Sequence, residues 1–155
     1  MPAALTVQSS SAADTRAFGA RLAGVLNRGD LVLLCGELGA GKTTLVQGIG
    51  EAYGIQEAMT SPTFVLVHTY GTDPVLAHAD AWRITNLSEV LDLGLDELLD
   101  DGAIGLVEWG DRIAGALGRE AVVVRITAGP DDESRTITVS APSEALLQRV
   151  EALAR

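Results

Sequence analysis

The feature that most constrains this chain is a glycine-rich segment between an apolar run and a stretch of helical character. The apolar run, Leu31–Cys35, is short and continuous, as is typical of a strand buried on both faces of a parallel sheet. Gly36–Thr43 then matches the pattern G-x-x-x-x-G-K-S/T, and residues 43–53 are predicted to form a helix. The sequence therefore predicts a strand, a tight backbone turn and a helix in direct succession.

The residue types in this pattern suit a bound phosphate chain. Glycines allow the backbone to fold around a phosphate with its N–H groups pointing inward. The start of the following helix adds unpaired amides and a positive dipole end. Lys42 supplies a mobile charge for the β- and γ-phosphates, and the Thr43 hydroxyl is suited to ligate Mg²⁺. The residues of this segment expected to contact a nucleoside triphosphate are Glu37, Leu38, Gly39, Ala40, Gly41, Lys42, Thr43 and Thr44.

Composition narrows the choice of nucleotide. The chain has ten arginines but a single lysine, Lys42, so the N/T-K-x-D motif by which Ras-type GTPases select guanine is impossible. The glycine spacing also does not fit the G-x-G-x-x-G pattern of dinucleotide sites. We therefore expect the cofactors to be ATP and Mg²⁺.

The remaining segments alternate between helical and strand-like patterns. Helices are predicted over residues 12–26, 43–53, 87–100 (broken at Gly94) and 143–153, and strands over residues 31–35, 64–70, 74–79, 103–109, 122–127 and 136–140. The second and third strands form a predicted hairpin. At 155 residues, 47 % of them hydrophobic, the chain suits one domain, residues 1–155, with a buried core. The predicted fold is α/β: a single-domain P-loop NTPase-like fold with a mixed, mostly parallel sheet flanked by helices.

Two acidic residues at predicted strand ends are candidates for metal or catalytic chemistry. Glu108 ends an apolar strand, where a carboxylate in P-loop folds usually reaches Mg²⁺; the alternative is a strand-end acid that faces solvent. Asp80 ends the hairpin strand, where an acid could orient an attacking water or hold a water of the magnesium shell. Taken alone, a surface ion pair with Arg83 is the commoner explanation, and the neighbouring His78 is expected to be structural.

Two further side chains have both a functional and a structural interpretation. Trp109 offers a flat surface to an adenine ring, or it is a half-buried aromatic residue of the core or rim. Thr63 lies in Ser61–Phe64, after the predicted helix 43–53, where P-loop switch segments often lie. The alternative for that segment is a proline turn that enters a strand.

Four motifs in this order and spacing resemble the TsaE family, formerly known as YjeE: GELGAGKTT at 36–44, SPTF at 61–64, HADAWR at 78–83 and VEW at 107–109. The resemblance covers nearly the whole chain. It implies a compact P-loop fold with slow ATP hydrolysis. It also implies a partnership with the TsaD and TsaB subunits, which modify adenosine 37 of ANN-decoding tRNAs to threonylcarbamoyladenosine.

The resemblance also implies roles for single residues. Lys42 and Thr43 would serve phosphate and Mg²⁺, Glu108 would serve Mg²⁺, and Trp109 would lie near adenine. Asp80 would be the acid required for hydrolysis, Thr63 the switch threonine, and Arg135 a weaker candidate for a nucleotide contact. Two positions depart from the family pattern: Trp82 replaces a tyrosine, and Gly110-Asp111 replaces proline or alanine followed by an acid, so the turn after VEW is expected to differ.

Charge and composition bear on partners and compartment. The net charge of -10 repels phosphate backbones, so we expect no strong direct binding of nucleic acid, and the partner subunits would hold the tRNA. One cysteine fits a reducing compartment, and neither a membrane span nor a signal peptide is evident, so the expected location is the cytoplasm. Two alternatives stay open: a small-molecule kinase on the same fold, and a nucleotide-gated binding module without turnover.

Overall fold

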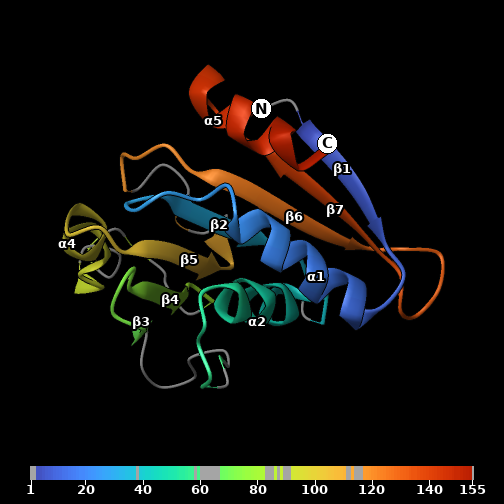
Figure 1. The fold of residues 1–155 in the computed structure, drawn as a ribbon, viewed down its shortest axis with the longest axis horizontal. Coiled ribbons are helices and arrows are strands. Elements are labelled where there is room, and N and C mark those ends of the chain that lie inside the picture. Colours follow the sequence, from blue (N-terminus) through green and yellow to red (C-terminus); the bar gives the residue numbers. More distant parts are fainter. Residues whose placement is uncertain are drawn as a thin grey trace.

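In the part of the chain that the structure describes, seven strands form one mixed sheet (Figure 1), and helices pack against both of its faces. The computed structural model describes residues 3–37, 39–57, 59, 67–82, 86, 88, 92–110, 113 and 117–154. The strands are β1 (Ala3–Ser9), β2 (Leu31–Cys35), β3 (Val67–Tyr70), β4 (Leu76–Asp80), β5 (Ile104–Glu108), β6 (Val122–Ala128) and β7 (Arg135–Ser140). The helices are α1 (Ala12–Ala23), α2 (Lys42–Ala52), α4 (Leu95–Asp100), α5 (Glu144–Glu151) and the short 3₁₀ helix η2 (Ala152–Ala154).

The sheet has the strand order β1-β7-β6-β2-β5-β4-β3. The four central strands β6, β2, β5 and β4 are mutually parallel, whereas β1, β7 and β3 each run antiparallel to their neighbours. The mixed α/β sheet is confirmed, but the expectation of a mostly parallel sheet is wrong, because three of the six described neighbouring pairs are antiparallel. Hairpins extend a parallel centre outward without the long crossovers that further parallel strands require.

Strand β2 is buried on both faces, as its continuous apolar run predicted. Val32 and Leu34 point into a core that they share with α1, α2 and α5. Leu31 and Leu33 point to the opposite face and into a second core that includes α4. The glycine-rich segment that follows β2 therefore starts from a strand that is buried along its whole length.

Helices α1 and α2 lie side by side on one face of the sheet (Figure 1). Gly48 on α2 makes this close approach possible, because a Cβ there would lie only 2.0 Å from the Arg16 carbonyl oxygen. Such a distance is far inside van der Waals contact, so any side chain would push the helices apart. The packing fixes the position of α2 and hence of its first residues.

Several element boundaries differ from the sequence expectation. Strand β1 was not predicted; its alternating residues Leu5 and Val7 become a strand only through antiparallel pairing with β7. Helix α1 ends at Ala23 rather than at residue 26, whereas the break predicted at Gly94 is confirmed, because α4 begins directly after it. The hairpin of β3 and β4 is confirmed. The start of the predicted strand 64–70 and most of residues 87–91 lie outside the described residues.

The parallel centre of the sheet brings four strand ends to one edge. Cys35, Asp80, Glu108 and Ala128 are the last residues of β2, β4, β5 and β6, and parallel strands end on the same side. Open α/β sheets bind ligands outside this carboxyl edge. The carboxyl edge of the central strands is therefore the expected place for a ligand. No helix in the described part of the chain is both long enough and apolar enough to cross a membrane.

Candidate functional site

The glycine-rich loop, residues 36–41, turns from β2 into α2 and needs glycine at both of its ends. A Cβ on Gly36 would lie 2.6 Å from the Ile126 carbonyl oxygen on the neighbouring strand. Gly41 has φ +112°, which side chains rarely tolerate, and it precedes α2 without a side-chain cap. The first N–H groups of α2 therefore face the loop, in the way that helix starts present them to anions. Leu38 lies outside the described residues.

Lys42 is folded back onto this loop. Its Nζ donates to the carbonyl oxygens of Gly36 and Glu37 at 2.6 and 3.1 Å, and the side chain is buried. The same ammonium lies 3.8 Å from the ring centroid of Trp109, a cation–π arrangement. The charge is thus held at the mouth of the loop by neutral groups, which an anionic ligand can replace with stronger partners.

Four polar side chains meet at the start of α2, and we call Thr43, His78, Asp80 and Glu108 the acidic end of the site. The Thr43 hydroxyl donates to Glu108 Oε1 at 2.9 Å, and His78 Nε2 lies 2.6 Å from Glu108 Oε2. Glu108 is only 3 % exposed and His78 is fully buried. Glu108 therefore faces the interior, and the alternative of a strand-end acid in solvent is wrong for this residue.

Asp80 lies directly beside Glu108, because the two are partners in the parallel register of β4 and β5. Its Oδ1 accepts a hydrogen bond from the backbone N–H of Trp82 at 2.8 Å. Two adjacent carboxylates repel each other, and a divalent cation between them would relieve that repulsion. Arg83, the alternative ion-pair partner of Asp80, lies outside the described residues.

The donor set suits one particular mode of metal binding. No group of three or more His, Cys, Asp and Glu side chains that could hold a metal is found in the described part of the chain. Mg²⁺ commonly takes only one or two oxygens from a protein, and phosphate oxygens and water complete the octahedron. The adjoining Thr43 hydroxyl and Glu108 carboxylate fit that mode.

Trp109 adopts a backbone conformation that is rare for a large side chain, with φ +59°. This turn points its ring toward Lys42 and Trp82; the two indole centroids are 4.4 Å apart. Gly110 follows it without room for a side chain, since a Cβ there would lie 2.5 Å from Leu33 Cβ. The glycine that departs from the family pattern is thus required by the packing beneath this turn.

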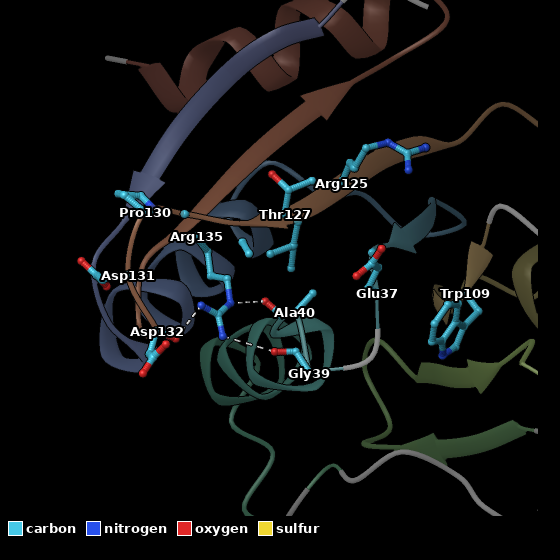
Figure 2. A pocket seen from close by; sticks show the side chains of 14 residues that line it. Glu37, Gly39, Ala40, Trp109, Arg125, Thr127, Pro130, Asp131, Asp132 and Arg135 are labelled. Carbon is cyan, nitrogen blue, oxygen red and sulfur yellow. Dashed lines mark hydrogen bonds between the residues drawn. The ribbon is translucent and has the colours of Figure 1, made fainter.

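A cavity of about 700 Å³ opens on the other side of the loop, between the loop, the end of β6 and the start of β7 (Figure 2). We call it the open cavity. This volume is within the range of small-molecule sites. In Figure 2 Glu37 lies between Trp109 and Arg135, and Thr127 faces the centre of the view. The other residues that line the open cavity and are labelled in Figure 2 are Gly39, Ala40, Arg125, Pro130, Asp131 and Asp132.

Arg135 holds the loop to the sheet at this cavity. Its Nε donates to the Ala40 carbonyl oxygen at 2.9 Å and its Nη2 to that of Gly39 at 3.3 Å (Figure 2). Its Nη1 donates to the carbonyl oxygens of Asp132 and Ser134, both at 2.8 Å. The guanidinium thus joins the glycine-rich loop to the turn between β6 and β7.

That turn is itself organised by Asp131. Its carboxylate accepts hydrogen bonds from the backbone N–H groups of Ser134 at 2.9 Å and Glu133 at 3.1 Å. These bonds, the one from Ser134 first, hold the pKa of the Asp131 carboxyl below its usual value. The rim of the open cavity is therefore shaped by local backbone contacts.

The structure brings most of the predicted residues together. Residues 39–44, Asp80, Glu108 and Trp109 line a second cavity of about 450 Å³ at the acidic end, and Glu37, Trp109 and Arg135 line the open cavity. Thr63 lies outside the described residues. Sequence reasoning treated His78 as structural and gave no role to Trp82. The available signal was spacing, since His78 and Asp80 are two residues apart on one strand and share a face.

The chain matches the family model described as threonylcarbamoyl adenosine biosynthesis protein TsaE over residues 9–137. Proteins named tRNA threonylcarbamoyladenosine biosynthesis protein TsaE from Streptomyces coelicolor and Treponema pallidum are 45 % and 37 % identical to it, over 83 % and 85 % of this chain and 91 % and 97 % of their own lengths. A crystal structure of Bacillus subtilis YdiB superposes with a TM-score of 0.79 at 30 % identity, and the match covers 97 % of this chain and 94 % of that one.

The fold and the site define a class of protein: an α/β protein with a glycine-rich loop at the carboxyl edge of its sheet. Within that class, this chain belongs to the TsaE family.

Proposed function

We propose that this chain is a P-loop ATPase that binds ATP with Mg²⁺ at the glycine-rich loop. The single observation that carries the proposal is the contact between the Thr43 hydroxyl and Glu108 Oε1 at 2.9 Å, beside Lys42 at the start of α2. A hydroxyl and a carboxylate at this place are the two protein groups that P-loop NTPases use for Mg²⁺. The parallel strands β6, β2, β5 and β4 around the loop agree with that fold.

Lys42 would act as the phosphate-binding cation. Its ammonium holds two neutral carbonyl oxygens, and charged phosphate oxygens are stronger acceptors than these. A bound triphosphate would therefore draw Lys42 away from Gly36 and Glu37. Bound Mg²⁺ would neutralise charge that develops on the phosphates during hydrolysis.

Asp80 would serve the hydrolysis step. It lies next to Glu108 in the β4–β5 register and lines the same cavity as Thr43. From that position its carboxylate is suited to accept a proton from, or to orient, a water molecule near the terminal phosphate. Thr63 is the further residue that the family motif points to for this step.

The open cavity is the place we propose for the nucleoside. It adjoins the loop directly and is large enough for a purine and a ribose. Trp109 lines both cavities, so its indole would contact the base while Lys42 beneath it contacts phosphate. Arg135 would act at the same place, through the loop that it holds and through its own charge. ATP is favoured over GTP because a guanine-selecting lysine motif is absent from the sequence.

In the cell, we propose that slow ATP hydrolysis by this chain supports threonylcarbamoyl transfer to adenosine 37 of tRNA. The relatives' names support the pathway. The net charge of -10 supports a division of labour in which the partner subunits TsaD and TsaB, and not this chain, bind the tRNA. The process would take place in the cytoplasm.

The deciding experiment is calorimetric titration with ATP, with GTP as the matched competitor, in the presence and absence of Mg²⁺. We expect ATP to bind, Mg²⁺ to strengthen binding, and GTP to bind more weakly. Phosphate release measured with and without TsaD and TsaB then tests turnover. ATP binding with no phosphate release under either condition would favour a nucleotide-gated module, and phosphate transfer to a metabolite would favour a kinase.

A further inference from the structure

His78 is a buried imidazole for which the proposed ATPase function has no use as it stands. Its side chain is fully buried within β4, and its Nε2 lies 2.6 Å from Glu108 Oε2. Its Nδ1 is buried and has no hydrogen-bond partner among the described residues. A polar ring has thus been placed in the core with one nitrogen satisfied and the other not.

The direction of the hydrogen bond follows from chemistry. A carboxylate that serves as a metal ligand is ionised and can only accept, so in the proposed site the hydrogen in this contact is carried by His78 Nε2. Glu108 then accepts from His78 at one oxygen and from Thr43 at the other. The Glu108 carboxylate is therefore held by two hydrogen bonds, one from the His78 imidazole in the core and one from the Thr43 hydroxyl on α2.

Strand geometry explains why His78 can reach Glu108. In the β4–β5 register His78 is opposite Leu106, and Asp80 is opposite Glu108. His78 therefore lies one pleat deeper than Asp80 on the same face of the sheet, and its ring extends diagonally along that face to the neighbouring carboxylate. The His78 ring thus lies farther from the carboxyl edge of the sheet, and Asp80 lies at that edge next to Glu108.

Packing alone does not account for a histidine here. A buried polar atom without a partner is unfavourable, and an apolar side chain of similar size would fill the same space without that cost. The neighbours of His78 in the same core, Leu76 and Leu106, are leucines. The contact with Glu108 is what distinguishes the histidine from such a residue.

We propose that His78 is a positioning residue for the magnesium site: its Nε2–H fixes the Glu108 carboxylate so that the other oxygen faces Thr43 and the cation of the nucleotide. The inference rests on the proposed function and deepens it. Partners that orient a metal ligand typically change metal affinity about 10–100-fold when they are removed. His78 does not touch the nucleotide and acts only through Glu108.

The test compares variants that keep or lose the donor. His78→Leu removes it with little change in volume, and His78→Gln keeps an N–H at a similar reach. We expect the Mg²⁺ concentration for half-maximal ATP binding to rise about 10-fold or more in His78→Leu and to stay within about 3-fold of wild type in His78→Gln. Both melting temperatures are measured in parallel. An unchanged Mg²⁺ requirement in a folded His78→Leu variant overturns the proposal.

A double variant separates positioning from a general loss of structure. If His78 acts through Glu108, then His78→Leu adds nothing to the Mg²⁺ defect of Glu108→Gln. Additive defects would contradict the proposal. Should His78→Leu not fold, His78→Asn replaces it, because its shorter amide stays polar but does not reach Glu108.

A measurement without nucleotide keeps this inference apart from the ATPase proposal. Nitrogen-15 NMR of the imidazole is expected to show the Nε2–H tautomer, with a hydrogen-bonded proton that is lost or shifted in Glu108→Ala. The Nδ1–H tautomer, or a signal that Glu108→Ala does not change, would overturn the inference even if ATP binds. Conversely, absence of Mg²⁺-dependent ATP binding in wild type would defeat the proposed function, while the NMR result still decides whether His78 holds Glu108.

Discussion

The two ends of the site are built in different ways. At the acidic end, side chains hold one another: Thr43 and the buried His78 both contact Glu108, which is only 3 % exposed. At the open cavity, exposed residues such as Asp131 and Asp132 form the rim, and the defining contacts are to the backbone. The acidic end is a cluster of side chains that bond to one another, and the open cavity is formed mainly by backbone groups.

This difference indicates where substitutions should matter. A buried hydrogen-bonded side chain cannot be removed without leaving a partner unsatisfied, so each change at the acidic end is costly to its neighbours. A rim built from backbone contacts tolerates changes in side chains, because water can form hydrogen bonds with the exposed backbone groups that lose a side-chain partner. The strongest effects on chemistry are therefore expected at the acidic end and the weakest at the open cavity.

The largest effect is expected for Asp80→Ala. General acid–base or water-orienting groups typically contribute about 10²–10⁴-fold to a rate, so hydrolysis should fall by that order while ATP affinity stays near that of wild type. Single-turnover rates with the proposed partner subunits TsaD and TsaB, alongside a Mg²⁺ titration of binding, provide the measurement. A parallel loss of Mg²⁺ affinity would make Asp80 part of the metal shell, and a wild-type hydrolysis rate would remove it from the catalytic residues.

Lys42→Ala tests the point where the two ends meet. Charge-assisted hydrogen bonds contribute about 1.5–3 kcal/mol each, so losing the ammonium should weaken ATP binding by about 100-fold or more. The fold should persist, since Lys42 contacts carbonyl oxygens of the loop and the Trp109 ring and is not part of the apolar core. Calorimetry measures the affinity and circular dichroism the fold. Unchanged affinity would contradict the assignment of this loop to phosphate.

Arg135→Ala tests whether the open cavity depends on the hydrogen bonds from Arg135 to the glycine-rich loop. The guanidinium holds the neutral carbonyl oxygens of Gly39 and Ala40 and lies outside the acidic end, so we expect only about a 3–10-fold loss of ATP affinity. Arg135→Lys is the matched control, since it keeps the charge but not the forked geometry. If Arg135→Lys binds ATP like wild type, the positive charge contributes to affinity and the paired hydrogen bonds to the loop do not. A loss as large as that of Lys42→Ala would break the comparison between the two ends.

The smallest effect is expected for Trp109→Phe, which keeps an aromatic ring over Lys42. Affinity for ATP should change by less than about 3-fold, because phenylalanine retains most of the stacking and cation–π contact. The fluorescence change on adding ATP should fall strongly, since Trp109 lines both cavities while Trp82 lines only the one at the acidic end. Trp82→Phe is the matched control. A full signal in Trp109→Phe would move the spectroscopic response to Trp82.

Much of the parallel centre could be predicted from local pattern. The run Leu31–Cys35 forms a strand buried on both faces because each of its residues is apolar and residues 31–34 pack alternately into the two cores. The β3–β4 hairpin also followed from its turn. By contrast, β1 could not be predicted, because an edge strand with only two clear alternating residues depends on β7 for its pairing.

What the sequence by itself determined is the strand, the glycine-rich loop and the helix start, together with the candidates Lys42, Thr43, Asp80 and Glu108. These follow from residues close together in the chain, where spacing and side-chain type are enough. The motifs are short and local, so their physical requirements can be stated without any tertiary contact.

Only the tertiary structure decided how these residues are connected. Thr43 and Glu108 are 65 residues apart, His78 and Glu108 are 30 apart, and Arg135 and Ala40 are 95 apart. Such contacts depend on strand order and register, and a slip of one residue would turn His78 or Glu108 to the opposite face of the sheet. That is why His78 could be read as structural from the sequence, and why its contact with Glu108 became visible only when β4 and β5 were aligned.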